Sequence, residues 1–380
     1  MSNTKNEALI ITKPKKIDLK ECPMPEPKKD ELLIEVHYVA VCGSDIKLFA
    51  GSYTAPHKYP IVIGHEWLGR VIQTCEGTDI KVDDYVVGDC SIFCGECYYC
   101  KFNKNHCIHI EKRGITLDGG CARYIAINKR HVTRCIDGLK DPKLLTLTEP
   151  MSVAVNGIAN RVPRDVLDRT RKALIMGCGG IGLMSLFTLR YLGVKDITMT
   201  DIVPEKVKMV NDWGLEGVHA LQMMPSEMVE GKKVEEEFTH GPNYGVMVSD
   251  HVEAKRVIPL DADGNEFKDS FDLIVEATGQ AESCLGVSVS LAAPCAHLVC
   301  LGHQKPLNID FGSILKKSMT IHASNGSTGG FPQAMEIIRD NEELVAQMVT
   351  DIVPLKDAAV YFRRKILKKP NIKVLIDLND

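Results

Sequence analysis

Four cysteines within one short loop have the spacing of a metal site. Cys94, Cys97, Cys100 and Cys107 follow the pattern C-x2-C-x2-C-x6-C in a segment rich in Tyr, Lys and Asn. Four thiolates at such intervals can close a tetrahedral shell around zinc, with bonds of about 2.3 Å, and a closed shell leaves no position for a substrate. Packed as free thiols, they would need apolar neighbours that this loop lacks. The pattern predicts a structural zinc site in a lobe over about residues 90–110, with His106 as an alternative fourth ligand.

A second set of candidate metal ligands is scattered along the chain. It comprises Cys42 in VCGSD, His65 and Glu66 in GHE, and Glu149 in TEP. A lone Cys or His is more often part of a core than a ligand, and no spacing argument joins residues so far apart in the sequence. Together, a thiolate, an imidazole and a carboxylate could leave one zinc position open for water or an alcohol oxygen, as catalytic zinc requires. Asp45 would then orient a ligand from outside the coordination shell.

The third motif is rich in glycine. The segment Gly177-Cys178-Gly179-Gly180-Ile181-Gly182 matches G-x-G-x-x-G, follows the strand-like ALIM and opens a helical stretch. In that context the motif predicts a dinucleotide site, because its glycines let backbone N–H groups and a helix N-terminus approach a pyrophosphate.

Asp201 indicates which dinucleotide is bound. It closes the next predicted strand, about 20 residues after the glycines, where a carboxylate accepts hydrogen bonds from ribose hydroxyls. A 2′-phosphate there would meet a like charge, and no Arg follows in the next three positions, so NAD is favoured over NADP. Asp201 could instead only cap the helix that begins near Pro204.

Length and composition limit the classes of function. At roughly 150 residues per domain, 380 residues indicate two domains. The 44% hydrophobic and 25% charged residues are those of a soluble globular chain with a sizeable core. The 46 basic and 50 acidic residues leave a net charge of −4, without the positive excess that binding a phosphate backbone needs. We therefore expect no nucleic-acid partner.

The chain carries no pattern for secretion or membrane insertion. Its first residues, MSNTKNEALI, lack the charged head, apolar run and cleavage site of a signal peptide. The stretch 174–194 is broken by glycines and Arg190, whereas a membrane span needs about 20 uninterrupted apolar residues. We expect a cytoplasmic protein without membrane association. Its clustered cysteines are then metal ligands or thiols rather than disulfides.

The elements that must position these residues change in kind along the chain. Short β-branched and aromatic runs, broken by Pro, Gly and Asp, predict a barrel-like antiparallel domain, with strands at 8–12, 31–41, 61–63, 67–74 and 85–87. From Lys172 strands and helices alternate, as in βαβ units on a parallel sheet. The predicted strands there are 173–176, 197–200, 272–277 and 297–301, and the helices end at 192 or cover 204–213 and 280–291. The last part has strands at 320–323 and 373–377 around a helix at 332–339.

One stretch fits neither pattern. Residues 217–272 are polar and charged, including KKVEEEF and DADGNEFKD, and are long for a connection. Charge runs are usually solvated surfaces, and we interpret this one so. Asp263-Gly264 favours a hairpin turn over a calcium loop, because the full calcium pattern is absent.

Taken in order, these motifs resemble the zinc-dependent medium-chain alcohol dehydrogenases, and within them the polyol, sorbitol and threonine dehydrogenase branch. The resemblance extends from the prolines near residue 23 to Lys373-Val374, and includes DGGCARY at 118–124 and EATG at 276–279. It implies an α/β fold in which a GroES-like β-barrel catalytic domain is interrupted by a Rossmann domain with a doubly wound parallel sheet. We expect the boundaries 1–152, 153–305 and 306–380, with the last segment returning to the catalytic domain.

The resemblance also implies roles for residues. Cys42, His65 and Glu149 would surround the catalytic zinc, and Glu66 could replace Glu149 or water. Ser44 would take the proton of the substrate. The cofactor would contact the glycine motif, Asp201 and the loops that follow two further strands, at Thr278, Gly279, Leu301 and Gly302.

Three positions depart from the family pattern. The lobe has six residues before its last cysteine instead of seven. Lys47 stands where many relatives have a histidine of the proton relay, so the relay runs by another route or Lys47 itself contacts cofactor or substrate. Trp67 follows the GHE motif where Phe is usual. The stretch 217–272 is also longer than in typical relatives, and neither it nor Trp67 changes the reaction class.

We therefore predict an enzyme that passes a hydride between a secondary alcohol of a polyol or sugar-like substrate and NAD. An amino-alcohol enzyme of the threonine type and a sugar-phosphate dehydrogenase are alternatives within the class. A noncatalytic zinc- and nucleotide-binding protein is disfavoured because Cys42, His65 and Ser44 are all present. A zinc-free reductase of enones or quinones is disfavoured because such enzymes lack the cysteine lobe and the catalytic zinc ligands, and both are present here. Relatives of this kind are commonly homodimers or homotetramers.

Overall fold

The structure is a computed structural model that describes residues 5–225, 257–259, 270–279, 284–302, 309–366 and 371–379. These residues form two compact units. The first contains the chain up to 152 and again from 326, and the second contains the chain between 153 and 325. Most of the charged stretch 217–272, including Asp263-Gly264, lies outside the described residues, as does the start of the helix predicted over 280–291.

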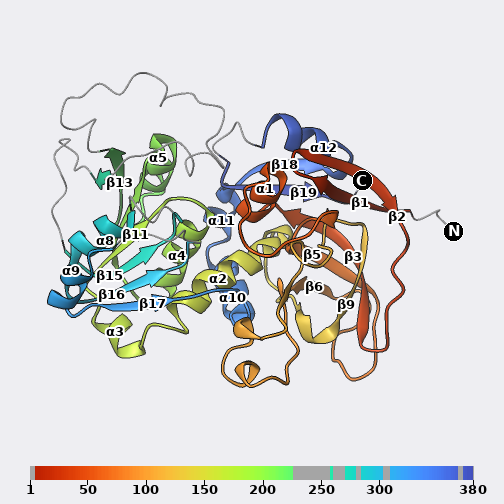
Figure 1. The fold of residues 1–380 in the computed structure, drawn as a ribbon, viewed down its shortest axis with the longest axis horizontal. Helices are drawn as coiled ribbons and strands as arrows, with labels where there is room; N and C mark the ends of the chain where they lie inside the picture. The colour runs from red at the N-terminus through yellow and green to blue at the C-terminus, as the bar shows by residue number, and fades with distance from the viewer. Residues whose placement is uncertain are drawn as a thin grey trace. The chain divides into compact units, whose positions relative to one another are not determined.

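The first unit is built from two main sheets (Figure 1). A three-stranded sheet has the order β2-β1-β4, and a seven-stranded sheet has the order β10-β6-β5-β3-β19-β18, with β9 also paired to β3. All of these pairs except β18–β19 are antiparallel. The strands are β1 Asn6–Lys13, β2 Lys16–Cys22, β3 Glu31–Ala40, β4 Ile61–Val62, β5 Glu66–Gln73, β6 Tyr85–Gly88, β9 Tyr124–Asn128, β10 Val132–Arg134, β18 Val349–Pro354 and β19 Lys373–Asp377.

Helices and a small hairpin complete this unit. The pair β7 Ser91–Ile92 and β8 Glu111–Lys112 forms a two-stranded sheet on either side of the four-cysteine lobe. The helices are α1 Gly43–Ala50, α10 Phe331–Asp340, α11 Glu342–Met348 and α12 Leu355–Arg364, and α2 Thr148–Ile158 runs across the boundary of the units. The core gathers inward-facing side chains of β1, β3, β5 and α12, among them Leu9, Ile34 and Phe362.

Trp67 fills a space in this core that two glycines leave open. Its side chain is 1% exposed. A Cβ atom on Gly88 would lie 2.0 Å from Trp67 Cζ2, and one on Gly120 would lie 2.6 Å from Trp67 Cδ1. The larger ring at this departure from the family pattern is therefore accommodated by glycines on β6 and before β9.

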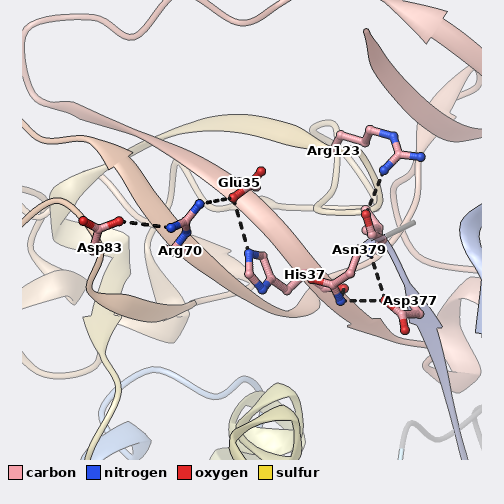
Figure 2. A network of polar contacts seen from close by, with 8 residues as sticks. Glu35, His37, Arg70, Asp83, Arg123, Asp377 and Asn379 are labelled. Carbon is pink, nitrogen blue, oxygen red and sulfur yellow. Dashed lines mark hydrogen bonds and ion pairs between the residues drawn. The ribbon is translucent and has the colours of Figure 1, made fainter. Parts of the chain in front are cut away.

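The C-terminal strand is tied into the first unit by main-chain and side-chain bonds (Figure 2). Beside the β19–β3 pairing, the His37 carbonyl accepts hydrogen bonds from Leu378 N, at 2.9 Å, and from Asn379 Nδ2, at 3.2 Å. An Arg123 guanidinium nitrogen donates to the Leu378 carbonyl at 2.8 Å. On the neighbouring strand, Glu35 accepts from Arg70 at 2.8 Å. The end of the chain is thus an internal strand of the same sheet as β3.

The second unit is a parallel sheet with helices (Figure 1). Its strand order is β14-β13-β12-β11-β15-β16-β17, and all pairs except β13–β14 are parallel. The strands are β11 Lys172–Met176, β12 Asp196–Asp201, β13 Val218–Pro225, β14 Val257–Pro259, β15 Phe271–Glu276, β16 Ala292–Cys300 and β17 Thr320–Ala323. The helices are α3 Arg164–Arg169, α4 Gly180–Tyr191, α5 Pro204–Asp212, α8 Gly286–Leu291 and α9 Phe311–Lys316.

The predicted fold class is confirmed: mainly antiparallel strands in one unit and a doubly wound parallel sheet in the other. The predicted strands and helices that lie within the described residues are present, with ends shifted by a few residues. The sequence patterns did not predict β2, β18, α1 or α12. In the part of the chain that the structure describes, no helix has the length and apolar character needed to span a membrane.

The Trp67 pocket leads to a test of packing. Gly88→Ala should lower the free energy of unfolding by about 1–3 kcal/mol, because the new methyl group overlaps the indole ring. Combining it with Trp67→Phe removes the overlapping ring atoms. Denaturant unfolding followed by circular dichroism should therefore show the double variant losing less than the sum of the single losses, by about 1 kcal/mol or more. Additive losses would contradict the pocket.

Candidate active site

The four lobe cysteines are brought together around one point. Their sulfurs lie 3.5 Å apart for the pairs 94–107 and 97–100, and 3.9 Å apart for 94–100 and 97–107. A zinc tetrahedron with bonds of about 2.3 Å has edges of about 3.8 Å. The spacing of the donor atoms therefore fits a four-thiolate zinc shell, although the last loop is one residue shorter than in the family pattern.

Backbone N–H groups favour the thiolate form of Cys94 and Cys97, whereas burial raises the pKa of Cys100 to about 12. Cys97 N donates to Cys94 Sγ at 3.4 Å, and His109 N donates to Cys107 Sγ at 3.3 Å. Such bonds to backbone N–H groups lower the pKa of Cys94, and lower that of Cys97 to about 6. Metal ligands must be deprotonated, so this arrangement favours a bound cation.

A second cluster joins residues that are far apart in the sequence. One ligand atom from each of Cys42, His65 and Glu66 lies within 4.8 Å of the others. His65 is 4% exposed and Glu66 is 0% exposed. Cys42 is the N-cap of α1, and His65 and Glu66 stand at the start of β5. A soft sulfur, an imidazole and a carboxylate are a donor set that zinc accepts.

Asp45 joins the two loops that carry Cys42 and His65. Its fully buried carboxylate accepts hydrogen bonds from Cys42 N at 2.9 Å and from Gly64 N at 3.2 Å, and lies 3.8 Å from His65 Nδ1. Burial is the main cause that raises the pKa of Asp45 above its usual value. The bonds to both loops match the orienting role that the sequence suggested for this residue.

The electrostatics of the cluster favour a cation. Burial by itself lowers the pKa of His65, but the negative charges of Cys42 and Asp45 outweigh that effect and hold the pKa well above its usual value. Burial raises the pKa of Glu149 to about 7, with a further contribution from Glu66. A positive charge at this point is therefore stabilised, and a coordinated divalent ion would supply it.

Lys373 is an unpredicted member of the site. Its ammonium donates to both carboxylate oxygens of Glu66 at 2.6 Å, and both side chains are buried. The negative charge of Glu66 outweighs the effect of burial and raises the pKa of Lys373. The sequence placed Lys373 only at the start of the last strand. No pattern around it signals a buried cation.

The remaining predicted residues of this centre lie at different distances from it. Glu149 stands near the start of α2, buried, but in the described chain it is not among the residues that share the 4.8 Å cluster. The Ser44 hydroxyl lies 3.3 Å from His65 Nε2. Lys47 is half-buried on α1, and the described residues show no hydrogen bond or ion pair between it and the cluster.

The predicted cofactor residues of the second unit meet at one edge of its sheet. They stand at the carboxyl ends of β11, β12, β15 and β16, or directly after them. The chain moves outward from β11 to β12 on one side and returns to β15 on the other, so the order of strands reverses at β11 and β15. In doubly wound sheets ligands bind outside the strand ends at such a point.

Two positions of the glycine motif require glycine for different structural reasons. Gly177 adopts a φ of +103°, which side chains disfavour. A Cβ atom on Gly182 would lie 1.8 Å from the Gly177 carbonyl oxygen, so only glycine lets α4 pack this close to the loop. Gly179 caps α4, where a Cβ atom would meet no described atom within 4 Å, and Gly180 and Ile181 open the helix. Its first N–H groups suit a pyrophosphate.

Asp201 contacts the glycine loop. One carboxylate oxygen accepts from Cys178 N at 2.7 Å, and the other accepts from Val203 N at 2.9 Å, at the N-cap of α5. Val203 is the N-cap residue of α5, which has no side-chain cap, so Asp201 binds the entry to this helix without capping it. Each carboxylate oxygen has a second lone pair, so these bonds leave capacity for ribose hydroxyls.

Glu276 organises the other two loops. Its fully buried side chain accepts from Thr278 N at 2.8 Å and from Gly279 N at 3.0 Å. Its carbonyl accepts from Leu301 N at 3.0 Å and from Gly302 N at 3.2 Å. Sequence reasoning noted the EATG motif without a role for its first residue, and a carboxylate inside an apolar strand was the available signal.

Comparisons with known proteins agree with both halves of this description. Residues 28–137 match the alcohol dehydrogenase GroES-like domain. The chain is 26% identical to D-arabitol-phosphate dehydrogenase of Enterococcus avium, over 94% of this chain and 92% of that protein. It is 27% identical to an L-threonine 3-dehydrogenase of Francisella philomiragia, over 80% of each. A zinc-binding dehydrogenase of Sinorhizobium meliloti bound to NADP has the same fold, with a TM-score of 0.78 at 22% identity, covering 99% of this chain and 100% of that one.

The fold and the two sites define an oxidoreductase that uses a dinucleotide. Residues 28–137 match an alcohol dehydrogenase GroES-like domain, and over most of its length the chain is similar to zinc-type alcohol dehydrogenases; its cofactors are zinc and NAD.

The Glu66–Lys373 pair predicts a large effect on stability. Lys373→Met should lower the free energy of unfolding of the metal-free protein by about 3–5 kcal/mol, because it leaves a buried carboxylate without its counter-ion. The matched control is Lys5→Met, which breaks the exposed pair with Glu21 and should leave the free energy of unfolding nearly unchanged. Equal losses in denaturant titrations would show that Glu66 is not held as described.

The Gly182 contact predicts a loss of cofactor binding. Gly182→Ala should weaken NAD binding at least about tenfold, or about 1.4 kcal/mol, because the methyl group pushes the Gly177 carbonyl out of the loop. Gly286→Ala, at the first position of α8 with open space around its Cβ in the described chain, should leave NAD binding unchanged. Calorimetric titration with NAD measures both. Equal affinity of the two variants would argue against this loop as the pyrophosphate site.

Proposed function

We propose that this enzyme oxidises a secondary alcohol group of a polyol or sugar-like substrate with NAD, and reduces the corresponding ketone in reverse. The observation that carries the proposal is the Cys42, His65 and Glu66 cluster with the Ser44 hydroxyl beside it, in a chain whose second unit has a complete dinucleotide motif. The carbinol C–H bond breaks with its electron pair going to the nicotinamide, and the hydroxyl proton leaves through the protein.

Cys42 and His65 are two of the three proposed protein ligands of the catalytic zinc, and the third is either Glu66 or Glu149. The geometry favours Glu66 as the third ligand, because it already shares the cluster. Its two oxygens are engaged by Lys373, however, so Glu149 stays the other proposed ligand. When bound, zinc supplies Lewis acidity that lowers the pKa of an alcohol toward neutrality. The four cysteines of the lobe are the proposed ligands of the structural zinc.

Ser44 is the proposed acceptor of the substrate proton. Its hydroxyl is within 3.3 Å of His65 Nε2, so a substrate oxygen at the metal would lie near it. Asp45 holds both loops of the cluster in place while the proton moves. Lys47 lies on α1, three residues after Ser44, where many relatives have a histidine of the proton relay. We propose that Lys47 contacts the cofactor or the substrate.

Gly177, Gly179, Gly180, Ile181 and Gly182 are proposed to hold the pyrophosphate, and Asp201 the ribose. The loops at Thr278–Gly279 and 301–302 are proposed to contact the rest of the dinucleotide. The proposal favours NAD over NADP, because the Asp201 carboxylate would repel a 2′-phosphate. Because the zinc-binding dehydrogenase of Sinorhizobium meliloti is bound to NADP, the affinities for NAD and NADP should both be measured.

The proposal also covers the compartment in which the enzyme acts and its oligomeric state. We expect the enzyme to act in the cytoplasm, where the lobe cysteines stay reduced. We also expect a homodimer or homotetramer. In the described sheet of the second unit β17 is an edge strand, and its Ile321 is 45% exposed, which suits pairing with a second copy.

The substrate class takes its support from the named relatives. One is named for a phosphorylated polyol and another for threonine, an amino alcohol. The amino-alcohol reaction is the second candidate, supported by that second relative.

A substrate screen tests the proposal. NADH formation should be measured with C4 to C6 polyols, amino alcohols, aldoses and their phosphates, using NAD and NADP, on protein with two zinc ions per chain. We expect oxidation of a polyol with NAD. Ser44→Ala should then lower kcat by about 100-fold or more while both zinc ions are retained. The control is Ser52→Ala, an exposed serine just beyond α1, which should keep full activity. Oxidation that survives removal of zinc would overturn the proposal.

A further inference from the structure

A ring of buried hydrogen bonds lies beside the proposed zinc ligand Glu149. Asp89 Oδ1 accepts from Ser91 N at 2.9 Å and from the Ser327 hydroxyl at 3.0 Å. Asn105 Oδ1 accepts from the Ser91 hydroxyl at 3.3 Å and from Thr328 N at 3.2 Å. Asp89, Ser91, Asn105 and Ser327 are all buried. The ring therefore connects three segments that are distant in sequence: the start of the lobe, its interior, and the chain at 327–328.

Asn105 holds the segment 326–328 by several contacts. Its Nδ2 donates to the Thr328 carbonyl at 3.2 Å, so one amide side chain binds both backbone groups of Thr328. Gly326, with a φ of +87°, packs against it so closely that a Cβ atom would lie 2.1 Å from Asn105 Oδ1. Asn105 itself belongs to the short 3-10 helix Lys104–His106, which ends directly before Cys107.

Ser327 connects the segment 326–328 to α2. Its hydroxyl donates its one proton to Asp89, and Ser327 is also a neighbour of the Glu149 side chain, whose pKa it lowers. Its carbonyl accepts from the Ser152 hydroxyl, and Ser152 stands one turn beyond Glu149 on α2. Ser327 is therefore held against the turn of α2 that carries Glu149.

We propose that Asn105 is a positioning residue for the Glu149 carboxylate. By fixing residues 326–328 it holds Ser327 against Glu149, and so links the order of the four-cysteine lobe to the affinity of the Cys42–His65 centre for its metal. The inference rests on the proposed function in one respect, namely that Glu149 serves this centre.

A ring that only satisfied buried polar groups would predict something else. Removing a member would then cost stability and leave the affinity of the catalytic site for metal unchanged. Residues that orient a metal ligand from outside the shell typically change metal affinity by about 10- to 100-fold when removed. Metal affinity therefore separates the two explanations without an activity measurement.

The test uses Co²⁺ as the probe in the full-length protein with zinc in the lobe. Binding is followed through the thiolate-to-cobalt absorption of the Cys42 site, and lobe zinc is quantified in parallel. Asn105→Ala should weaken Co²⁺ binding about tenfold or more. The matched control is Asn128→Ala, because Asn128 also caps a 3-10 helix, by accepting from Arg130 N, and has no bond to residues 326–328 in the described chain. It should leave Co²⁺ binding unchanged.

A double-mutant cycle tests the route. Ser327→Ala should weaken Co²⁺ binding to a similar degree, and the double variant should be no weaker than Ser327→Ala alone, because both act through one contact. Effects that multiply would overturn the proposal, and so would normal Co²⁺ affinity in Asn105→Ala.

A further variant keeps the test decisive if the alanine variant loses lobe zinc. Asn105→Asp keeps the acceptor for Thr328 N and loses the donor to the Thr328 carbonyl, so an intermediate loss of affinity is expected. Normal affinity in this variant, together with normal affinity in Ser327→Ala, would overturn the proposal.

Failure of the proposed function would look different. If Glu149→Gln leaves Co²⁺ binding unchanged while Asn105→Ala weakens it, both the assignment of Glu149 as a ligand and the positioning role of Asn105 toward it are overturned. If wild-type protein binds Co²⁺ normally but oxidises no alcohol, the proposed reaction is wrong and the coupling can still be measured.

Discussion

The buried Asp45 carboxylate is the contact on which the catalytic centre depends. Cys42 lies two residues after β3 and caps α1, and His65 directly precedes β5. The antiparallel pairing of Ala40 with Glu66 brings the two loops near each other, and the Asp45 side chain joins them. Asp45 accepts a backbone N–H from each loop and faces the ring of His65. An unpaired carboxylate at this depth would be costly, so these bonds must form together when the unit folds. Folding of the barrel and assembly of the ligand set are therefore a single event.

The same principle recurs in the second unit with different groups. There Glu276 and Asp201, two carboxylates at strand ends, bind the N–H groups of neighbouring loops. The parallel strands supply the common edge, and the acidic side chains fix the loops that follow it. In each unit a carboxylate shapes a binding loop by accepting from its backbone.

Sequence patterns were sufficient where chemistry is local. The four-cysteine spacing, the glycine motif between a strand and a helix, and the alternating βαβ pattern each lie within a few tens of residues, and they predicted the fold class and the grouping of the lobe sulfurs. The short helix α1 was not foreseen, because its eight residues carry only a weak apolar stripe and begin at a cysteine. Lys373, Asn105 and Ser327 were not foreseen either. Their partners lie far away in sequence, up to 307 positions for Lys373 and Glu66, so only the tertiary fold defines them.

The hydrogen bond between Ser152 and Ser327 has an evolutionary meaning. Residue 152 is where the chain leaves the first unit, and residue 326 is where it comes back, so the inserted stretch departs from and returns to neighbouring points of its host. An insertion whose two ends meet leaves the host sheet continuous, which is the circumstance in which whole domains are tolerated within another fold. The nucleotide-binding sheet is thus a module that ancestral recombination could exchange while the metal-bearing barrel kept its own architecture.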